Sequence, residues 1–458
     1  MKITRMDPEQ KVRYLTTEPI PKLVRELSIP TMVSMMVTAF YNMADTAFVG
    51  RLDNQSTAAV GVAFSAMAMI QAISFLFGHG SGNYISRQLG ARNYEDARRM
   101  AATSFFTAFA SGVVLGILGI LFVTPLSRLL GSTPTILPYT VRYLRVIFVG
   151  TPFIMCSFVL NNHLRFQGNA SVAMIGIVTG AVANVLLDPL LIFGLSMGVE
   201  GAALATVISQ IMSFVLLWVL HRKRAVVQVH WHQMSLKRRY LEGILKGGIP
   251  SMFRQGLGSL ATVLLNLAAG YYGGNMADQA IAAMGVVGRI TAFANSALIG
   301  FGQGFQPICG TNYGAGCYKR VREAFFFCLK LGSGTLAVFS VLGILFAHPL
   351  MLLFRNDEQV ARIGALALRA QCLVLVLSVW IILCSMLLQT IGMAAKASVV
   401  ASARQGIMFV PMILLLPWLF GLAGVQFAQM AADILSFALT LPIGWSVLEQ
   451  LREDRPKA

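Results

Sequence analysis

Long apolar stretches alternate with short polar connections along almost the whole chain. Each apolar stretch holds roughly 20 to 30 residues, and a helix of about 20 residues is long enough to cross the hydrocarbon core of a bilayer. The pattern therefore predicts an all-α integral membrane protein with twelve transmembrane helices. Their approximate bounds are 23–50, 57–79, 96–124, 138–163, 170–193, 201–221, 242–272, 279–305, 321–347, 360–390, 397–420 and 423–447.

Basic residues gather in every second connection between these stretches. Arg87, Arg92 and Arg98 follow the second stretch, and a further cluster at 222–239 follows the sixth, whereas the intervening connections carry few basic residues. Cytoplasmic loops are enriched in Lys and Arg. The first twenty residues are polar and lack the apolar segment of a signal peptide. We therefore expect both termini to be cytoplasmic.

The two halves of the chain resemble one another. RELSIPTM around Pro30 returns as LKGGIPSM around Pro250, and QLGARNYEDARR from Gln88 returns as NYGAGCYKRVRE from Asn312. A near-constant offset indicates a duplicated unit of six helices, and an even number makes the two copies parallel repeats. The predicted parts are a cytoplasmic N-terminal segment 1–22, a first lobe 23–221, a cytoplasmic linker 222–240, a second lobe 241–450 and a cytoplasmic tail 451–458.

Composition agrees with a membrane protein. Hydrophobic residues make up 56% and charged residues 12% of the chain, where soluble domains carry about 25% charge. The net charge of +17 would suggest nucleic acid in a soluble protein, but here it belongs to the connections, and we expect no nucleic-acid partner. The six cysteines form no CxxC pair, so we expect neither a disulfide nor a structural metal.

Two aspartates interrupt the apolar stretches of the first lobe. Asp45 and Asp188 each lie about five residues before the predicted outer end of a helix, so they share a depth. Tyr41 and Asn184 precede them by four residues and lie on the same helix faces, and Thr206 falls at nearly the same level. Charged groups within a membrane are costly and call for an explanation.

Such oxygen-bearing groups suit two tasks. They can bind a small hard cation, with Na⁺ at Asp45, Asn184 and Asp188 as one option, or they can share a proton, because neighbouring carboxylates resist double ionisation. Either task would couple ion binding to protein shape. We expect no cofactor beyond a coupling ion, H⁺ or Na⁺. Each aspartate could instead be a structural residue that bonds to a helix end.

The second lobe does not repeat this cluster. It places Arg289 and Asp433 within its helices, and an ion pair between them is the favoured interpretation over contact with a substrate. Met36 belongs to a methionine-rich stretch that would suit a flexible pocket lining. Pro30 and Pro250 occupy equivalent places in the first helix of each lobe and are the best hinge candidates.

Four stretches carry a resemblance to a known family. YNMADTAFVG from Tyr41, SRQLGAR from Ser86, ANVLLDPLLIFG from Ala183 and GRITAFANSALIGFGQGFQPICGTNYGA from Gly288 resemble the multidrug and toxic compound extrusion (MATE) family, in its MepA-like and DinF-like bacterial branch. The resemblance covers essentially all twelve helices. It implies two six-helix lobes arranged as a V in a bacterial cytoplasmic membrane.

The resemblance also implies a function. The family exports cationic or amphipathic compounds in antiport with H⁺ or Na⁺, and its first-lobe cation site matches Tyr41, Asp45, Asn184, Asp188 and Thr206 here. Asn161 resembles a further family position. We expect a monomeric transporter in contact with membrane lipid, not an enzyme, because no HExxH or GxSxG motif lies within a span. The alternative is a lipid-linked oligosaccharide flippase of related fold, which the intramembrane Arg254, Arg289 and Arg404 would suit.

Overall fold

The computed structural model describes residues 6–354 and 357–453, and over these ranges the chain forms helices and no strand. The helices of the first half are α1 (Pro8–Thr17), α2 (Ile20–Val49), α3 (Asn54–Gly90), α4 (Tyr94–Leu121), α5 (Val123–Leu129), α6 (Leu137–Phe166), α7 (Ala170–Pro189), η2 (Leu190–Gly194) and α8 (Gly198–Arg224). Those of the second half are η3 (Trp231–Gln233), α9 (Arg238–Tyr272), η4 (Gly274–Met276), α10 (Ala277–Gly314), α11 (Tyr318–Leu345), α12 (Ala347–Phe354), α13 (Glu358–Val374), α14 (Leu377–Ile391), α15 (Ala394–Ser402), η5 (Ala403–Ile407), α16 (Phe409–Phe420) and α17 (Leu422–Gln450).

These helices account for the membrane spans that the apolar pattern predicts. Among the described residues, ten helices are long and apolar enough to cross a membrane, and α13 with α14, which are bent by 56° at their junction, make eleven if the pair counts as one span. The remaining predicted span corresponds to α9, which has 35 residues but is more polar because it carries Arg254, Gln255 and Asn266. The prediction of an all-α multi-pass membrane protein is therefore confirmed.

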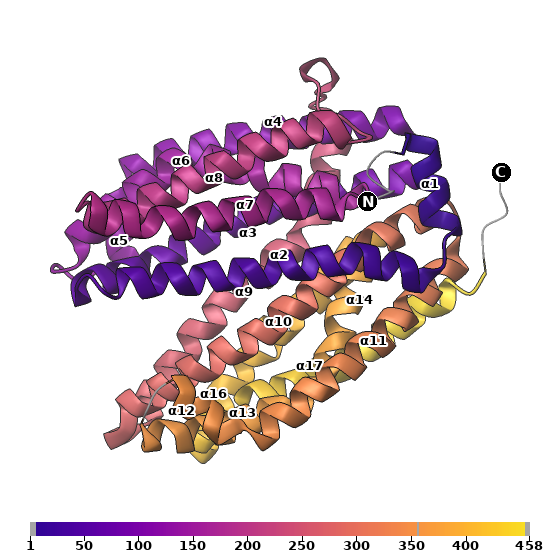
Figure 1. Ribbon diagram of the computed structural model, residues 1–458. Coiled ribbons are helices and arrows are strands. Elements are labelled where there is room, and N and C mark those ends of the chain that lie inside the picture. The colour runs from indigo at the N-terminus through magenta and orange to yellow at the C-terminus, as the bar shows by residue number, and fades with distance from the viewer. Residues whose placement is uncertain (1–5, 355–356, 454–458) are drawn as a thin grey trace.

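The helices form two bundles that converge at one end of the molecule and spread apart at the other (Figure 1). One bundle holds α2 to α8 and the other α9 to α17, and the described parts of both termini lie at the converging end. The first helix of each bundle also packs against the opposite bundle, because α2 contacts α10 and α9 contacts α3. We call the two bundles the N-lobe and the C-lobe.

Glycines allow the lobes to touch backbone to backbone at the converging end. A Cβ atom on Gly248 of α9 would lie 2.0 Å from the Leu76 carbonyl oxygen of α3, and one on Gly304 of α10 would lie 2.4 Å from Ser28 Cα of α2. Ser28 Oγ donates a hydrogen bond of 3.1 Å to the Phe301 carbonyl oxygen across the same contact. Small residues at helix interfaces permit such close packing in a membrane.

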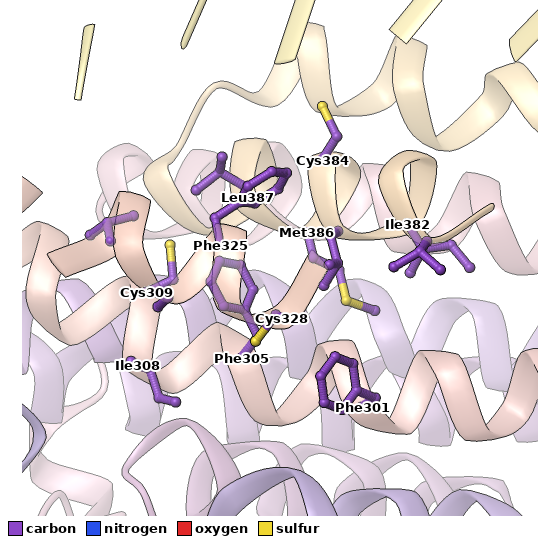
Figure 2. Packing of buried hydrophobic residues seen from close by; sticks show 14 of the residues in the cluster. Phe301, Phe305, Ile308, Cys309, Phe325, Cys328, Ile382, Cys384, Met386 and Leu387 are labelled. Atoms are coloured by element: carbon purple, nitrogen blue, oxygen red, sulfur yellow. The ribbon is translucent and has the colours of Figure 1, made fainter. Parts of the chain in front are cut away.

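A large apolar cluster fills the C-lobe behind this contact. Figure 2 shows Phe305 and Phe325 at its centre, beside Cys309 and Cys328. The ring centroids of the two phenylalanines are 6.3 Å apart in an edge-to-face arrangement, which is a favourable geometry for aromatic pairs. All six cysteines are free, so these thiols act as small apolar groups.

The segment before the first span contains a short helix that contacts both lobes. Asp7 caps α1 and Pro8 begins it, a combination typical of helix starts. Lys11 Nζ donates a hydrogen bond of 2.5 Å to Asn169 Oδ1 in the N-lobe. Asn312 Nδ2 of the C-lobe donates one of 3.0 Å to the Leu15 carbonyl oxygen. The helix therefore bridges the lobes at their converging end.

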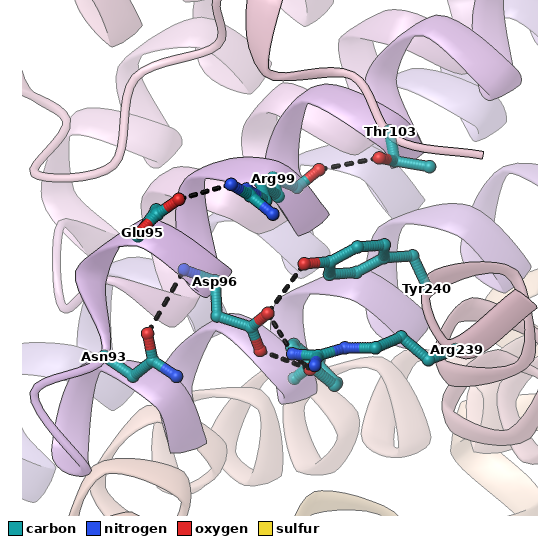
Figure 3. A network of polar contacts seen from close by, with 8 residues as sticks. Asn93, Glu95, Asp96, Arg99, Thr103, Arg239 and Tyr240 are labelled. Carbon is teal, nitrogen blue, oxygen red and sulfur yellow. Dashed lines mark hydrogen bonds and ion pairs between the residues drawn. The ribbon is translucent and has the colours of Figure 1, made fainter. Parts of the chain in front are cut away.

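The connection between the lobes is anchored to the N-lobe by a polar network (Figure 3). Asp96 of α4 is buried and accepts hydrogen bonds from Tyr84 Oη at 2.5 Å and Tyr240 Oη at 2.7 Å. Arg239 pairs with the same carboxylate. These contacts fix the start of α9 against the N-lobe, although α9 belongs to the other half of the chain.

Several boundaries differ from the expected ones. The predicted spans 57–79 and 279–305 are parts of longer helices, α3 and α10, which run on to Gly90 and Gly314. The short helices α5 and α12 follow α4 and α11 at equivalent places. The lobe and linker boundaries predicted above remain predictions, and residues 454–458 of the predicted tail lie outside the described residues.

Candidate functional site

The first two candidate residues face each other across neighbouring helices. Asp45 lies near the end of α2 and Asp188 near the end of α7, and these two helices pack together. Both side chains are buried, and their carboxyl groups lie within hydrogen-bonding reach of one another. Two ionised carboxylates at such a separation repel strongly in a low-dielectric interior. A proton or a small cation between the two carboxyl groups would relieve this repulsion.

Several oxygen atoms of this cluster lack a donor. Asn184 Nδ2 donates a weak hydrogen bond of 3.4 Å to Asp188 Oδ1. Among the described residues, no donor reaches the buried atoms Asp45 Oδ1, Asp188 Oδ2 and Asn184 Oδ1. Buried oxygens without a donor are costly, and three of them in one cluster can be satisfied together by a bound proton or a small cation.

The helix that carries Asp188 is locally distorted. After Pro189, α7 changes into the π-helical turn η2, because proline cannot donate to the helix ladder and its ring disturbs the preceding turn. Single π turns within helices are frequent at functional sites. Asp188 thus lies at the end of the regular helix, two residues before the π turn begins.

A small cavity is lined by two neighbours of the carboxyl pair, although neither aspartate lines it. It has a volume of about 70 Å³, and Tyr41, Asn161 and Asn184 are among the residues that line it. Asn161 Nδ2 donates a hydrogen bond of 2.9 Å to the Ala173 carbonyl oxygen. Asn161, which resembles a further family position, therefore shares a cavity with two members of the predicted cluster. We call this space the N-lobe cavity.

Tyr143 of α6 is a member of the site that the sequence reasoning missed. Its side chain is fully buried, donates a hydrogen bond of 3.6 Å to Met67 Sδ, and lies within electrostatic range of Asp45. Thr206 lies beside Tyr143 but donates its hydrogen bond, of 3.1 Å, to the Ala202 carbonyl oxygen of its own helix. Tyr143 lies only seven residues into α6, at the same end of the span as the aspartates, and this depth is the signal that would have found it.

The predicted partner of Asp433 in the C-lobe, Arg289, is wrong. Asp433 is paired with Arg404, at 2.7 Å between Arg404 Nε and Asp433 Oδ1 and 3.1 Å between Nη2 and Oδ2. Arg404 lies in the π turn η5, which directs its side chain toward α17. Arg289 is exposed on α10 and lies outside the residues that line either cavity.

A larger cavity of about 450 Å³ lies between the lobes, mostly against the C-lobe. It shares Met35, Phe75 and Gln303 with the N-lobe cavity, so the two spaces are neighbours. Met35 lines both cavities, whereas the predicted pocket residue Met36 lines neither. We call the larger space the central cavity.

The two hinge candidates lie inside long helices. Pro30 is in the interior of α2 and Pro250 in the interior of α9, and both are buried. Each lies on the part of its helix that contacts the opposite lobe, next to Thr31 and Gly248 respectively. A bend at either proline would move one lobe relative to the other, and this role remains a prediction.

Two helical bundles around a central cavity, with a buried carboxyl pair in one of them, define a multi-pass membrane transporter. The chain belongs to the MatE family, whose model matches residues 30–190 and 250–415. The multidrug export protein MepA of Staphylococcus haemolyticus is 27% identical over 449 residues, which cover 98% of each chain. MepA of Staphylococcus aureus strain MSSA476 is 28% identical over 451 residues, covering 97% of this chain and 98% of the relative.

Solved structures of this family are also similar. An outward-facing multidrug resistance MATE family transporter of the MOP superfamily superposes with a TM-score of 0.89 at 27% identity. The match covers 98% of this chain and 98% of that one. The expected family and fold class are therefore confirmed.

Proposed function

We propose that the protein exports multiple organic cations or amphipathic compounds in exchange for H⁺ or Na⁺. The observation that carries the proposal is the direct apposition of Asp45 and Asp188 beside the N-lobe cavity. Export of multiple drugs is supported by the relatives that are named multidrug export proteins.

Coupling follows from the charge of the carboxyl pair. Without its ion, the pair carries negative charge next to Tyr41 and Asn184, and this charge attracts a cationic compound into the neighbouring cavities. Binding of H⁺ or Na⁺ removes the charge and weakens that attraction. Because linkage is reciprocal, the bound compound in turn disfavours the ion.

The proposed orientation places both termini in the cytoplasm. The lobes then converge on the cytoplasmic side and the cavities open to the outside, as the outward-facing conformation of the similar MATE transporter also suggests. In this state an external ion would reach Asp45 and Asp188 and release the compound outward. The lobes would then close on the outer side by bending at Pro30 or Pro250, and this step would complete the transport cycle.

Efflux from proteoliposomes tests the proposal. Ethidium transport is measured under a proton gradient and, separately, under a sodium gradient, for the native protein, for Asp45→Asn and for Asp188→Asn. Both variants are expected to lose at least about tenfold in the gradient-driven rate, because a neutral amide cannot exchange its charge for an ion. Asp278→Asn is the matched control, since Asp278 is exposed at the start of α10.

Two results would overturn the proposal. If both Asp45→Asn and Asp188→Asn transported ethidium at the native rate under a gradient, the carboxyl pair would not be needed for ion coupling. Failure of the native protein to respond to either gradient would favour the flippase alternative. Two of the three arginines do not support that alternative, because Arg404 is neutralised by Asp433 and Arg289 lies outside the cavities, whereas Arg254 lines the central cavity.

A further inference from the structure

The connection between the lobes is much longer than the other connections at the converging end of the molecule. Residues 225–237 join α8 to α9. Four other connections at this end contain only two or three residues, at 91–93, 167–169, 315–317 and 392–393. The long connection also protrudes from the side of the N-lobe that faces away from the C-lobe, so it does not take the direct path to α9 (Figure 1). A loop of this length usually has a function of its own.

The connection is fixed to the N-lobe. The Val227 amide donates a hydrogen bond of 2.8 Å to Gln167 Oε1, and Gln167 Nε2 donates one of 3.3 Å to the Val227 carbonyl oxygen. Near the other end, the Ser235 amide donates to Thr103 Oγ1 of α4 at 3.0 Å. These bonds hold the segment between them, which includes the turn η3, along α4.

Trp231, at the tip of the connection, lies at the depth of the membrane boundary. Its ring packs edge to face on Phe106 of α4, with 4.7 Å between the ring centroids. Phe106 is seven residues beyond Arg99, the last charged residue of α4, and therefore about 10 Å further into the helix. Trp218 of α8 belongs to the same layer, because its ring lies 5.2 Å from that of Phe105. Tryptophans are enriched at this level of a bilayer.

The apolar side chains at the tip point away from the protein. Trp231 is 65% exposed and Leu236 is 63% exposed, whereas Val229 is buried against the N-lobe. Exposed tryptophan and leucine side chains on the outer side of a transmembrane bundle suit insertion between acyl chains. His230 and His232 flank Trp231 and can turn their polar ends toward the headgroups, as amphipathic side chains do at a membrane boundary.

The two ends of the connection carry positive charge that no carboxylate offsets. Residues 222–239 contain neither aspartate nor glutamate. Arg238 pairs with Glu242, and Arg239 pairs with Asp96. The other four basic residues form no ion pair within the part of the chain that the structure describes, and we call them the basic cluster: Arg222, Lys223, Arg224 and Lys237.

We propose that residues 222–237 form a docking surface for anionic phospholipids of the leaflet at the converging end. Trp231 and Leu236 lie among the acyl chains, and the basic cluster binds the headgroup phosphates. Arg222 joins the two parts, because its guanidinium lies 5.0 Å from the ring centroid of Trp218 and can still donate to a phosphate from its edge. The surface belongs to the N-lobe alone, so the inference is independent of the proposed export function.

Tryptophan quenching tests the insertion. Lipids with brominated acyl chains quench a tryptophan that touches them. The full-length protein is placed in nanodiscs of phosphatidylcholine with or without bromine. The chain has five tryptophans, so the Trp231 signal is taken as the difference between the native protein and Trp231→Phe. Bromine is expected to quench this signal by at least about half, because Trp231 is exposed at the depth of the acyl chains.

The same signal tests the preference for anionic lipid. Nanodiscs contain a three-to-one mixture of phosphatidylcholine and phosphatidylglycerol, and bromine is carried either by the phosphatidylglycerol or by an equal number of phosphatidylcholine molecules. In the native protein, brominated phosphatidylglycerol is expected to quench Trp231 at least about threefold more strongly, because each basic side chain near the headgroups adds to the attraction. Replacing all four residues of the basic cluster by glutamine should reduce this preference to less than about 1.5-fold.

A control variant removes the same number of positive charges elsewhere at the converging end. Its four exposed basic residues, each replaced by glutamine, are Arg13, Arg25, Lys396 and Arg452. This variant is expected to keep the native preference. The unfolding midpoint of each variant in detergent verifies that it is folded.

Three results would overturn the proposal. Equal quenching of Trp231 by the two brominated lipids in the native protein would mean that the surface does not select anionic phospholipid. Absence of quenching by either lipid would place the connection outside the membrane. An equal loss of preference in the control variant would assign the selection to the net charge of the protein and not to the basic cluster.

Discussion

Replacing Gly248 by alanine is expected to disturb the contact that closes the converging end of the molecule. The new Cβ atom would lie 2.0 Å from the Leu76 carbonyl oxygen, where ordinary contact begins at 3.4 Å. Relief requires α9 and α3 to separate by about 1.4 Å, the difference between these two distances. The obstacle is backbone, so no side chain can rotate away.

The same helix supplies a matched control. Gly256 also lies in α9, and a Cβ atom there meets no atom of the described residues within 4 Å. Alanine favours a helix over glycine by up to about 1 kcal/mol, and both variants gain this term. Overpacking costs about 1 to 3 kcal/mol, and the rigid obstacle places Gly248→Ala at the upper end. The two variants should therefore differ by about 2 to 3 kcal/mol.

Thermal unfolding in detergent, followed by tryptophan fluorescence, measures this difference. At about 2 °C per kcal/mol, the low end of the range for large domains, Gly248→Ala should unfold about 4 to 6 °C below Gly256→Ala. Gly256→Ala should match or slightly exceed the native protein. Equal unfolding midpoints for the two variants would refute the reasoning and would mean that the lobes do not approach so closely at this point.

Two further predictions concern charged groups. Asp433→Asn should lower the free energy of unfolding by about 2 to 3 kcal/mol because it leaves Arg404 without its carboxylate. The double variant Arg404→Met, Asp433→Leu should recover most of this loss. A native-like unfolding midpoint for Asp433→Asn would contradict the prediction. Burial lowers the pKa of Lys11 in α1 from 10.5 to about 7. At a pH between these two values the Lys11 amine is therefore protonated when α1 is undocked and neutral when α1 is docked. Docking of α1 should therefore strengthen as pH rises from about 7 toward 10. Limited proteolysis of the N-terminal segment measures it, and Lys11→Met should remove the pH dependence; an unchanged pH dependence in that variant would assign it to another group.

The apolar pattern predicts the spans well because a bilayer imposes a minimum apolar length on each of them. The pattern underestimates the lengths of α3 and α10 because their last turns lie beyond the apolar stretch. Arg87 of α3 is held by a contact with the other lobe, and Asn312 of α10 by a contact with α1. Arg87 Nη1, for example, donates to the Thr390 carbonyl oxygen. Such contacts between distant parts of the chain leave no periodic signal in the sequence.

For the candidate site as well, the sequence predicts some features and misses those that depend on contacts between distant residues. Sequence position gives the depth of a residue along a span, and depth was enough to select Asp45 and Asp188, because their helices are neighbours. Depth gives neither the rotation of a helix about its axis nor the identity of its neighbour. The partner of Asp433 was therefore wrong, since the π turn η5 turns Arg404 toward α17. Tyr143 was missed because no aspartate lies four residues from it, which is the spacing that selected Tyr41 and Asn184.

The hydrogen bonds of Arg165 have a consequence for how the protein is made. Its acceptors Gln303 and Gln306 lie 138 and 141 residues further along the chain. During synthesis the N-lobe therefore enters the membrane with a guanidinium that can donate to Asn162 of its own helix, while its two acceptors in α10 do not yet exist. The N-lobe must hold this charge in contact with water or lipid headgroups until α10 arrives. Insertion of α10 is thus the step that commits the two halves to one another, and a chain truncated before α10 should be a favoured target of membrane quality control.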